Sequence, residues 1–115
     1  MTGKETLWFY ATLKGIRQAN MKLLIYEFLK TFRLRHLANV PTKNYGVAEK
    51  RRLSLATAMI GNPDILVLDD ASSGMDAKSM EFFKGILSSL IRQGKTVVIT
   101  SNNIEEYSSI ANRVA

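Results

Sequence analysis

Two short, uninterrupted apolar runs constrain this chain more than any other feature, because a segment with helical spacing separates them. Residues 65–68 read Ile-Leu-Val-Leu and residues 96–100 read Thr-Val-Val-Ile-Thr, with turn residues on both sides. Runs of this kind are typical of parallel strands that are buried on both faces. The segment between them has a helix cap at Asp76 and a helix stop at Gly94. The order strand, helix, strand predicts a right-handed βαβ unit of a parallel sheet, and therefore an α/β fold.

The second strand is expected to lead into a last helix. Asn102 or Asn103 can cap it, and Glu105 and Glu106 would lie in its first turn, where the helix dipole favours negative charge. Two parallel strands alone leave edges and faces that other strands normally cover. We therefore expect the sequence to be a piece of a larger α/β domain.

The first part of the chain predicts helices only. Thr2 and Glu5 have the spacing of a capping box, and Gly15 is a suitable stop for the helix that they begin. A second helix is expected from Asn20, because apolar residues follow it at intervals of three and four. The stretch that follows contains Pro41 and breaks this pattern.

A third helix is expected over residues 47–60, since Gly61 and Pro63 follow it in the order that ends helices. The change from helices to the βαβ pattern falls at this point. The sequence therefore predicts two parts, a helical part over residues 1–62 and a part with parallel strands over residues 63–115.

Composition excludes several kinds of site. The chain of 115 residues has no cysteine and a single histidine, His36, so disulfides, thiolate metal sites and a histidine metal cluster are not expected. No apolar run approaches the ~20 residues that cross a membrane. The net charge of +6 includes the consecutive cations Lys50, Arg51 and Arg52, which we interpret as solvated side chains. Nucleic acid is not expected, because aromatic and basic residues do not alternate in a binding motif, whereas an anionic partner remains open.

The ends of the two predicted strands carry the candidate chemistry. Asp69 and Asp70 follow the first strand, and Ser101 and Asn102 follow the second. Ligands of parallel sheets bind beyond the carboxyl ends of the strands, so these residues are expected to converge. An aspartate at this position can help to hold Mg²⁺ on nucleotide phosphates, and a second acidic residue can polarise water. The plainer alternative is that both aspartates only cap the following turn; the two aspartates in this topology favour the nucleotide site.

No phosphate-binding loop accompanies these residues. Gly94, Lys95 and Thr96 match the end of the pattern G-x-x-x-x-G-K-[ST], but Ser89 stands where the first glycine is required. The order there is also helix then strand, whereas such a loop joins a strand to a helix.

Taken together, these segments resemble the nucleotide-binding domain of ATP-binding cassette (ABC) transporters, and subfamily A, the lipid exporters, most of all. The stretch MTGKETLWFYATLKGI is similar to the first helix of the helical subdomain. NYGVAEKRRLSLATAMIGNPDILVLDDASSGMDAKS is similar to the signature loop and helix, the Walker B strand and the D-loop, in unbroken order. GKTVVITSNNIEE is similar to the switch region. The resemblance implies a P-loop NTPase fold, with residues 1–62 in the helical subdomain and residues 63–115 in the RecA-like core.

The resemblance also implies roles for individual residues. Two such domains close around two ATP molecules with Mg²⁺, and each ATP contacts the signature loop of the opposite domain. By position, Asp69 would bind Mg²⁺, Asp70 would be the catalytic base and Asn102 would stand at the switch histidine. The signature Ser-Gly-Gly-Gln/Asn would correspond to Gly46, Val47, Ala48 and Glu49. Ser73 and Asp76 would lie in the D-loop.

Several of these positions depart from the family pattern. Side chains at Val47 and Ala48 obstruct the close approach to phosphate that glycine permits, and Glu49 adds a negative charge. Asp70 is one methylene shorter than glutamate, and a misplacement of about 1 Å can cost on the order of 10²-fold in rate. Asn102 cannot carry the positive charge of a histidine. We therefore expect an impaired ATP site, and whether the chain belongs to an active enzyme stays open.

The implied partners are a second nucleotide-binding domain and the membrane domains of the same transporter, which would handle a lipid substrate. The implied location is the cytoplasmic face of a membrane. Two alternatives remain: a non-catalytic interaction module derived from such a domain, and a soluble ABC-type ATPase that acts on nucleic acid or ribosomes.

Overall fold

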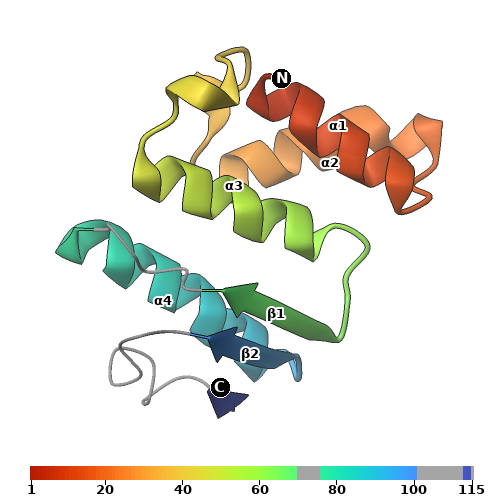
Figure 1. The fold of residues 1–115 in the computed structure, drawn as a ribbon. Helices are drawn as coiled ribbons and strands as arrows, with labels where there is room; N and C mark the ends of the chain where they lie inside the picture. The colour runs from red at the N-terminus through yellow and green to blue at the C-terminus, as the bar shows by residue number, and fades with distance from the viewer. Residues whose placement is uncertain (70–75, 101–112, 115) are drawn as a thin grey trace. The chain divides into compact units, whose positions relative to one another are not determined.

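The computed structural model describes residues 1–69, 76–100 and 113–114 and divides the chain into two compact units. Figure 1 shows the helices of the first unit and the strands and helix of the second. The helical unit is Met1–Asn62 and the strand unit is Pro63–Ala115. The described elements follow the order expected from the sequence, three α-helices and then strand, helix and strand.

The helical unit contains three α-helices and two short 3₁₀ helices in its described residues. These are α1 (Gly3–Leu13), α2 (Gln18–Thr31), η1 (Arg35–Leu37), η2 (Thr42–Asn44) and α3 (Val47–Met59). Buried apolar side chains from every α-helix and from the segments that follow or join them form its core: Leu7, Ala11, Met21, Ile25, Leu29, Phe32, Leu34, Tyr45, Leu53, Leu55, Ala56 and Ile60.

The helix boundaries follow local signals in most places. Thr2 and Glu5 form the predicted capping box, because the Glu5 N–H donates to the Thr2 hydroxyl and the Thr2 N–H donates to the Glu5 carboxylate. Gly15 follows the end of α1 with φ of +79°, a conformation that glycine adopts without strain. The predicted start of α2 was two residues late, since Arg17 precedes the helix without a side-chain cap and Asn20 lies inside it.

Lys14 closes the far end of α3. Its Nζ atom donates to the carbonyl oxygens of Thr57, Ala58 and Ile60 at 3.1, 3.3 and 2.9 Å. The last carbonyls of a helix have no partner within the helix, and the dipole there favours a cation. Lys14 therefore fixes the end of α3 against the end of α1.

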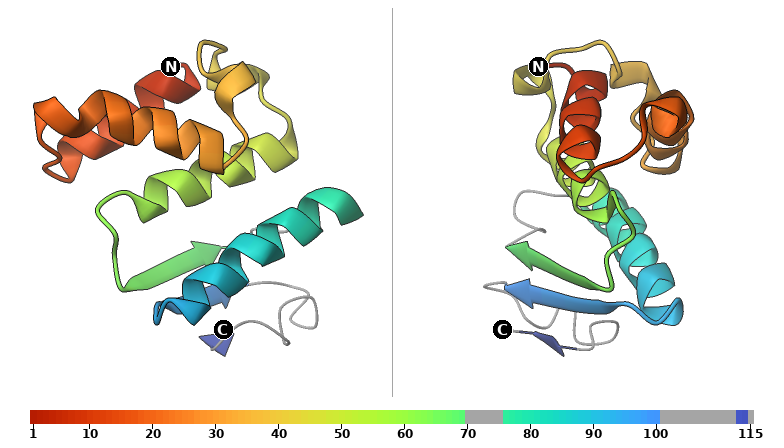
Figure 2. Two further views of the ribbon diagram at one scale, coloured as in Figure 1. Left: turned by 180° about the vertical axis from the view of Figure 1, so that it is seen from behind. Right: turned by 90° about the vertical axis from the view of Figure 1, so that its right-hand side faces the viewer.

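The strand unit holds a parallel sheet in the order β1–β2–β3. Its elements are β1 (Ile65–Asp69), α4 (Ala77–Arg92), β2 (Thr96–Thr100) and β3 (Arg113–Val114). Strands β1 and β2 pair in register from Ile65 opposite Thr96 to Asp69 opposite Thr100. Figure 2 shows α4 lying along one face of these strands. The βαβ unit is therefore confirmed, and the two-residue strand β3 adds a third strand that the sequence pattern did not indicate.

The expectation that the first strand is buried on both faces was wrong. Leu66 and Leu68 are buried, but Ile65 and Val67 are 63% and 68% exposed. Side chains alternate along a strand, so the buried Leu66 and Leu68 belong to one face of β1 and the exposed Ile65 and Val67 to the other. A continuous apolar run places apolar side chains on both faces of a strand. It does not show that other parts of the same chain bury both faces.

Gly94 and Lys95 both have structural roles. Gly94 ends α4, and Lys95 links the start of β2 to the residues before β1. Gly94 follows α4 with φ of +90°, as a helix stop does. Lys95 is buried, and its Nζ donates to the Pro63 carbonyl oxygen at 2.8 Å. The structure therefore confirms Gly94 as a helix stop, and Thr96 is the first residue of β2.

The last predicted helix, from Asn102 or Asn103, lies outside the described residues. Within the described ranges, no helix has the length and apolar composition that crossing a bilayer requires. The identification of the two units as a helical subdomain and part of a RecA-like core stays a prediction.

Candidate functional site

The structure describes the predicted site residues to different extents. Asp70, Ser73 and Asn102 lie outside the described residues. For Asp69 the backbone is described as the last residue of β1. The remaining predicted positions, Gly46 to Glu49 and Asp76, are described with their side chains.

The carboxyl ends of β1 and β2 meet at one edge of the sheet. Asp69 stands directly opposite Thr100 in the parallel register. The backbone therefore brings the first predicted metal ligand beside the end of the strand that leads toward Asn102. This part of the sequence-based site, the convergence of two strand ends, agrees with the backbone.

Asp76 caps α4 with its carboxylate. Its Oδ1 accepts a hydrogen bond from the Ser79 N–H at 2.7 Å. This bond favours the ionised form and lowers the pKa of Asp76 below its usual value. The side chain is exposed, so a structural role as helix cap accounts for it within the described residues.

The loop before α3 presents the next group of predicted residues. Gly46 is the cap residue of α3 and is exposed, and Val47, the first helical residue, is 48% exposed. Ala48 is partly exposed behind them. Side chains at Val47 and Ala48 thus stand at the surface of a helix start, where an approaching ligand would meet Cβ atoms in place of bare backbone.

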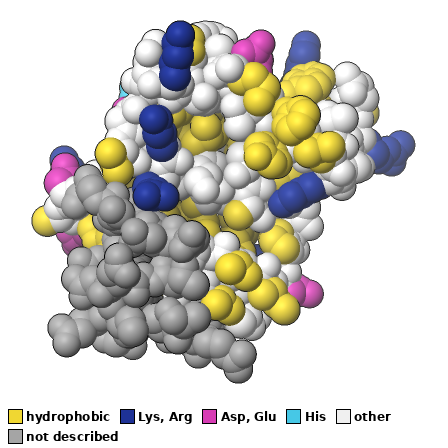
Figure 3. Space-filling view, viewed as in Figure 1, with side chains coloured by type: hydrophobic (Ala, Val, Ile, Leu, Met, Phe, Trp, Pro, Cys, Tyr) yellow, Lys and Arg dark blue, Asp and Glu magenta, His cyan; other side chains and the backbone are white. Residues whose placement is uncertain are grey.

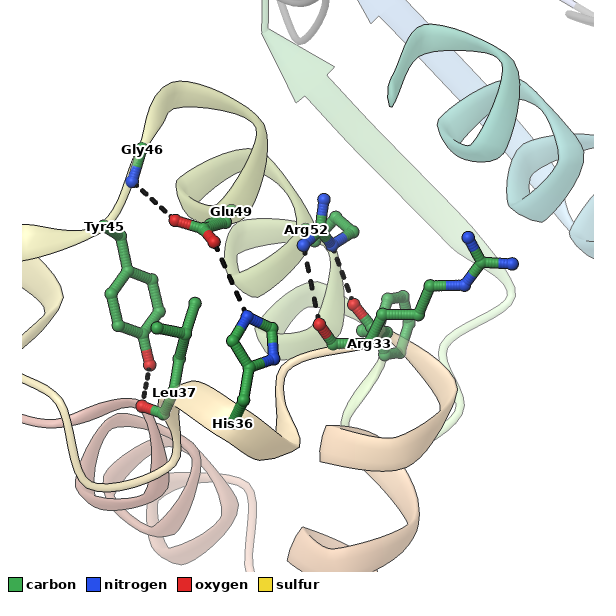
Figure 4. A network of polar contacts seen from close by, with 8 residues as sticks. Arg33, His36, Leu37, Tyr45, Gly46, Glu49 and Arg52 are labelled. Carbon is green, nitrogen blue, oxygen red and sulfur yellow. Dashed lines mark hydrogen bonds and ion pairs between the residues drawn. The ribbon is translucent and has the colours of Figure 1, made fainter. Parts of the chain in front are cut away.

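Glu49 turns back onto this helix start, as Figure 4 shows. Its Oε1 accepts a hydrogen bond from the Gly46 N–H at 2.8 Å. Its Oε2 lies 3.8 Å from Nε2 of His36, which is 66% exposed. The carboxylate therefore satisfies a backbone donor that a helix without such a residue leaves open for an anion or for water.

Arg52 was misread as a solvated cation. Its Nε donates to the Phe32 carbonyl oxygen at 2.8 Å, and its NH2 group lies 3.5 Å from the Arg33 carbonyl oxygen. Burial lowers the pKa of Arg52 from its usual value, and the negative charge of Glu49 opposes this shift. Arg52 joins α3 to the end of α2, which leaves Lys50 and Arg51 as the outer members of the basic run.

Tyr45 anchors the loop from the other side, a contact that the sequence pattern did not indicate. Its hydroxyl donates to the Leu37 carbonyl oxygen at 2.6 Å, and burial raises the pKa of that hydroxyl. A Cβ atom at Gly3 would overlap the Tyr45 hydroxyl oxygen. Two sequence features could have indicated this contact. Tyr45 is a large aromatic residue just before the start of α3, and Gly3 is a glycine at the first position of α1.

The strand unit offers a strand end at Asp69, and the helical unit offers, separately, a helix start whose first donor is internally satisfied. Among the described residues, no group of three or more His, Asp or Glu side chains is placed to hold a metal ion. The role of Asp69 as a metal ligand stays a prediction, whereas the helix start does not fit an open phosphate cradle, because Glu49 already accepts the Gly46 N–H.

Comparison with known proteins identifies the family. No protein-family model matches the chain. It is 35% identical over its full 115 residues to ATP-binding cassette sub-family A member 13 of Homo sapiens, of which it covers 2%. Over the same span it is 33% identical to retinal-specific phospholipid-transporting ATPase ABCA4 and 36% identical to glucosylceramide transporter ABCA12, both of Homo sapiens. It covers 5% and 4% of those two proteins, so the chain corresponds to a small stretch of each relative. The chain belongs to subfamily A of the ATP-binding cassette proteins, as a segment of that family's sequence.

Proposed function

We propose that the chain forms part of a nucleotide-binding domain with a P-loop NTPase fold. Full-length similarity to subfamily A proteins supports this proposal, as does the parallel βαβ unit that ends in Asp69. The helical unit then corresponds to the helical subdomain with the signature helix α3, and the strand unit to part of the RecA-like core. The complete domain binds ATP with Mg²⁺, and Asp69 is the metal ligand that this chain supplies.

We further propose that the ATP site to which these residues contribute is impaired. The observation that carries this proposal is the hydrogen bond from the Gly46 N–H to the Glu49 carboxylate. A phosphate oxygen at that place would have to displace a bound carboxylate and would lie beside its negative charge. Val47 adds a side chain on the same exposed helix start, where the family uses glycine.

The catalytic positions support the same conclusion from the sequence. Asp70 places the general base one methylene farther from a water molecule than glutamate would. Asn102 can accept or donate a hydrogen bond at the switch position but does not carry positive charge. Ser73 and Asp76 belong to the D-loop, in which Asp76 also caps α4.

The proposed setting is a membrane transporter. ABCA4 is named as phospholipid-transporting and ABCA12 as a glucosylceramide transporter, which favours a lipid substrate handled by membrane domains. The partners of this segment are then a second nucleotide-binding domain and those membrane domains, at the cytoplasmic face. An interaction module without nucleotide chemistry is the competing proposal, and the occupied helix start is the observation that favours it.

A chimeric transporter tests the proposal. The 115 residues replace the matching stretch of ABCA4, and binding of an ATP analogue is measured with and without Mg²⁺. We expect binding that depends on Mg²⁺ and that Asp69→Ala weakens strongly. Asp64→Ala is the matched control, because Asp64 is exposed at the opposite end of β1.

If the Asp69→Ala and Asp64→Ala chimeras bind the ATP analogue equally well, Asp69 is not a ligand of the metal ion. A folded chimera that binds no nucleotide at all would favour the interaction module.

A further inference from the structure

The helical unit contains a groove between α1, α2 and η1 that the nucleotide chemistry does not use. Its volume is about 560 Å³. The buried side chains of Ile25 and Leu29 supply an apolar floor, and the aromatic rings of Trp8 and Tyr26 stand beside them. Cavities of some 300–1,000 Å³ with apolar and aromatic linings are typical of sites for small molecules.

Three cations border this groove. Lys4 comes from α1, Lys22 from α2 and Arg35 from η1. The guanidinium carbon of Arg35 lies 5.2 Å from the centroid of the Tyr26 ring, a cation–π distance that holds both groups in place. Charge from three separate elements therefore converges on one apolar floor.

No acidic residue is among the described residues that line this groove. An adjoining hollow of about 330 Å³ shares Lys4 and Trp8 and includes Glu5. The Glu5 carboxylate accepts the Thr2 N–H in the capping box of α1, which directs its charge to the helix start. The groove itself is electropositive.

The charge of the whole unit has the same sign. Residues 1–62 hold eleven Lys and Arg against three Asp and Glu, a net charge of +8, whereas the remaining residues hold five against seven. Figure 3 shows hydrophobic side chains gathered on the helical unit with Lys and Arg side chains around them. Such a field raises the local concentration of anions.

We propose that this groove binds a small organic anion that has an aromatic body and a phosphate or carboxylate group. The body would lie on Ile25 and Leu29 between the rings of Trp8 and Tyr26. The anionic group would meet Lys22 and Arg35 at the border. The volume of the groove suits one small molecule, and the charge complementarity selects an anion over a neutral or cationic ligand.

Trp8 is the only tryptophan of the chain, so its fluorescence reports directly on this groove. The full chain is titrated with phenyl phosphate, with excitation at a wavelength that phenyl phosphate does not absorb. Inorganic phosphate and phenol are titrated in parallel, because each carries one half of the ligand. We expect phenyl phosphate to saturate the signal at a concentration at least tenfold below that of either half.

If inorganic phosphate binds as tightly as phenyl phosphate, the groove is only a nonspecific cluster of positive charge. If phenol binds as tightly as phenyl phosphate, it is only an apolar patch. Either result would overturn the proposal. A response to vesicles that contain phosphatidylserine, without a response to phenyl phosphate, would assign this face to a membrane surface instead.

Variants locate the binding. Lys22→Gln and Arg35→Gln are each expected to weaken phenyl phosphate binding by about two- to fivefold, as exposed charge pairs do. Lys43→Gln makes the same change of charge in η2, away from the groove, and is expected to leave the affinity unchanged. A loss with Lys43→Gln as large as with Lys22→Gln would contradict a local site. Because the groove uses none of the proposed nucleotide residues, this test can fail while the nucleotide proposal stands.

Discussion

The Glu49 carboxylate accepts a hydrogen bond from the Gly46 N–H at 2.8 Å. A side chain of α3 therefore satisfies the backbone donor of the residue that caps this helix. This contact has two consequences. It stabilises the helix start in the folded chain, because a backbone donor gains a charged partner. It also places negative charge at the helix start that, in the proposed function, would face a phosphate.

Removal of this cap should destabilise the chain. We expect Glu49→Ala to lower the free energy of unfolding by about 1 kcal/mol, the usual cost of a lost helix cap. Glu49→Gln should lose less, because its amide oxygen can still accept the Gly46 N–H. Urea unfolding measures both changes, with Glu81→Gln on the exposed face of α4 as control. Equal stability of Glu49→Ala and the parent chain would show that the carboxylate does not support the helix.

The carboxylate caps should give the chain a stability that acid removes. Hydrogen bonds from backbone N–H groups lower the pKa of Asp76 and of Glu5 below their usual values. A group with a lowered folded pKa stabilises above its unfolded pKa, and this contribution is lost as the pH falls through the folded value. Asparagine caps a helix as well as aspartate does but does not titrate. We therefore expect Asp76→Asn to lose less stability than the parent chain between pH 5 and pH 2, measured by urea unfolding at several pH values.

An identical pH dependence in the Asp76→Asn variant and the parent chain would contradict the pKa shift of Asp76. Glu81→Gln serves as the control for removal of a carboxylate from α4 without loss of a cap.

The Tyr45 hydroxyl and Gly3 should behave as a coupled pair. Gly3→Ala would place a Cβ atom onto that hydroxyl, and overpacking of this kind costs about 1–3 kcal/mol. Tyr45→Phe removes the obstructing oxygen together with its bond to Leu37, at a cost of about 1 kcal/mol. We expect the Gly3→Ala change to cost less in the Tyr45→Phe background, which a double-mutant cycle measures.

Gly85→Ala is the matched control for this cycle. A Cβ atom at Gly85 meets nothing within 4 Å, and the position lies in the exposed interior of α4, so this variant should gain up to about 1 kcal/mol. Strict additivity of the Gly3 and Tyr45 changes would show that the two groups do not share one space.

Lys14 should stabilise the folded chain through its ammonium group and not through its aliphatic side-chain carbons. Lys14→Met keeps the length of the side chain but removes three contacts to the end of α3. We expect a loss of about 1 kcal/mol in the free energy of unfolding, because the ammonium is partly exposed and screened. Lys43→Met, in η2, is the control and should change stability little. A loss of equal size in the two variants would contradict the specific role of Lys14.

Local signals predicted most of the element boundaries. The capping box of Thr2 and Glu5, the cap Asp76 and the stops at Gly15 and Gly94 each act within a few residues, so their effect is readable in the sequence. The contacts that the sequence did not indicate join residues far apart. Lys14 reaches the end of α3 across more than 40 positions, and no local pattern identifies that partner.

The site was predictable to the extent that it depends on topology. Parallel pairing brings Asp69 beside Thr100, as the βαβ order implied. The orientation of Glu49 was not predictable, because the same residue can extend toward a ligand or fold back onto its own helix. Exposure of Val67 was missed for a related reason, since an apolar run does not state what covers it.

The most direct test of the impaired site is the rate of ATP hydrolysis of the ABCA4 chimera that carries this segment. We expect a turnover at least about 10²-fold below that of ABCA4, since in the proposed role Asp70 would be shorter than glutamate by one methylene, and a misplacement of about 1 Å can cost that much. Restoration of Gly46 to Glu49 as Ser-Gly-Gly-Gln, together with Asp70→Glu and Asn102→His, should recover most of the lost rate. An unrepaired chimera that already hydrolyses ATP as fast as the repaired one would contradict the account.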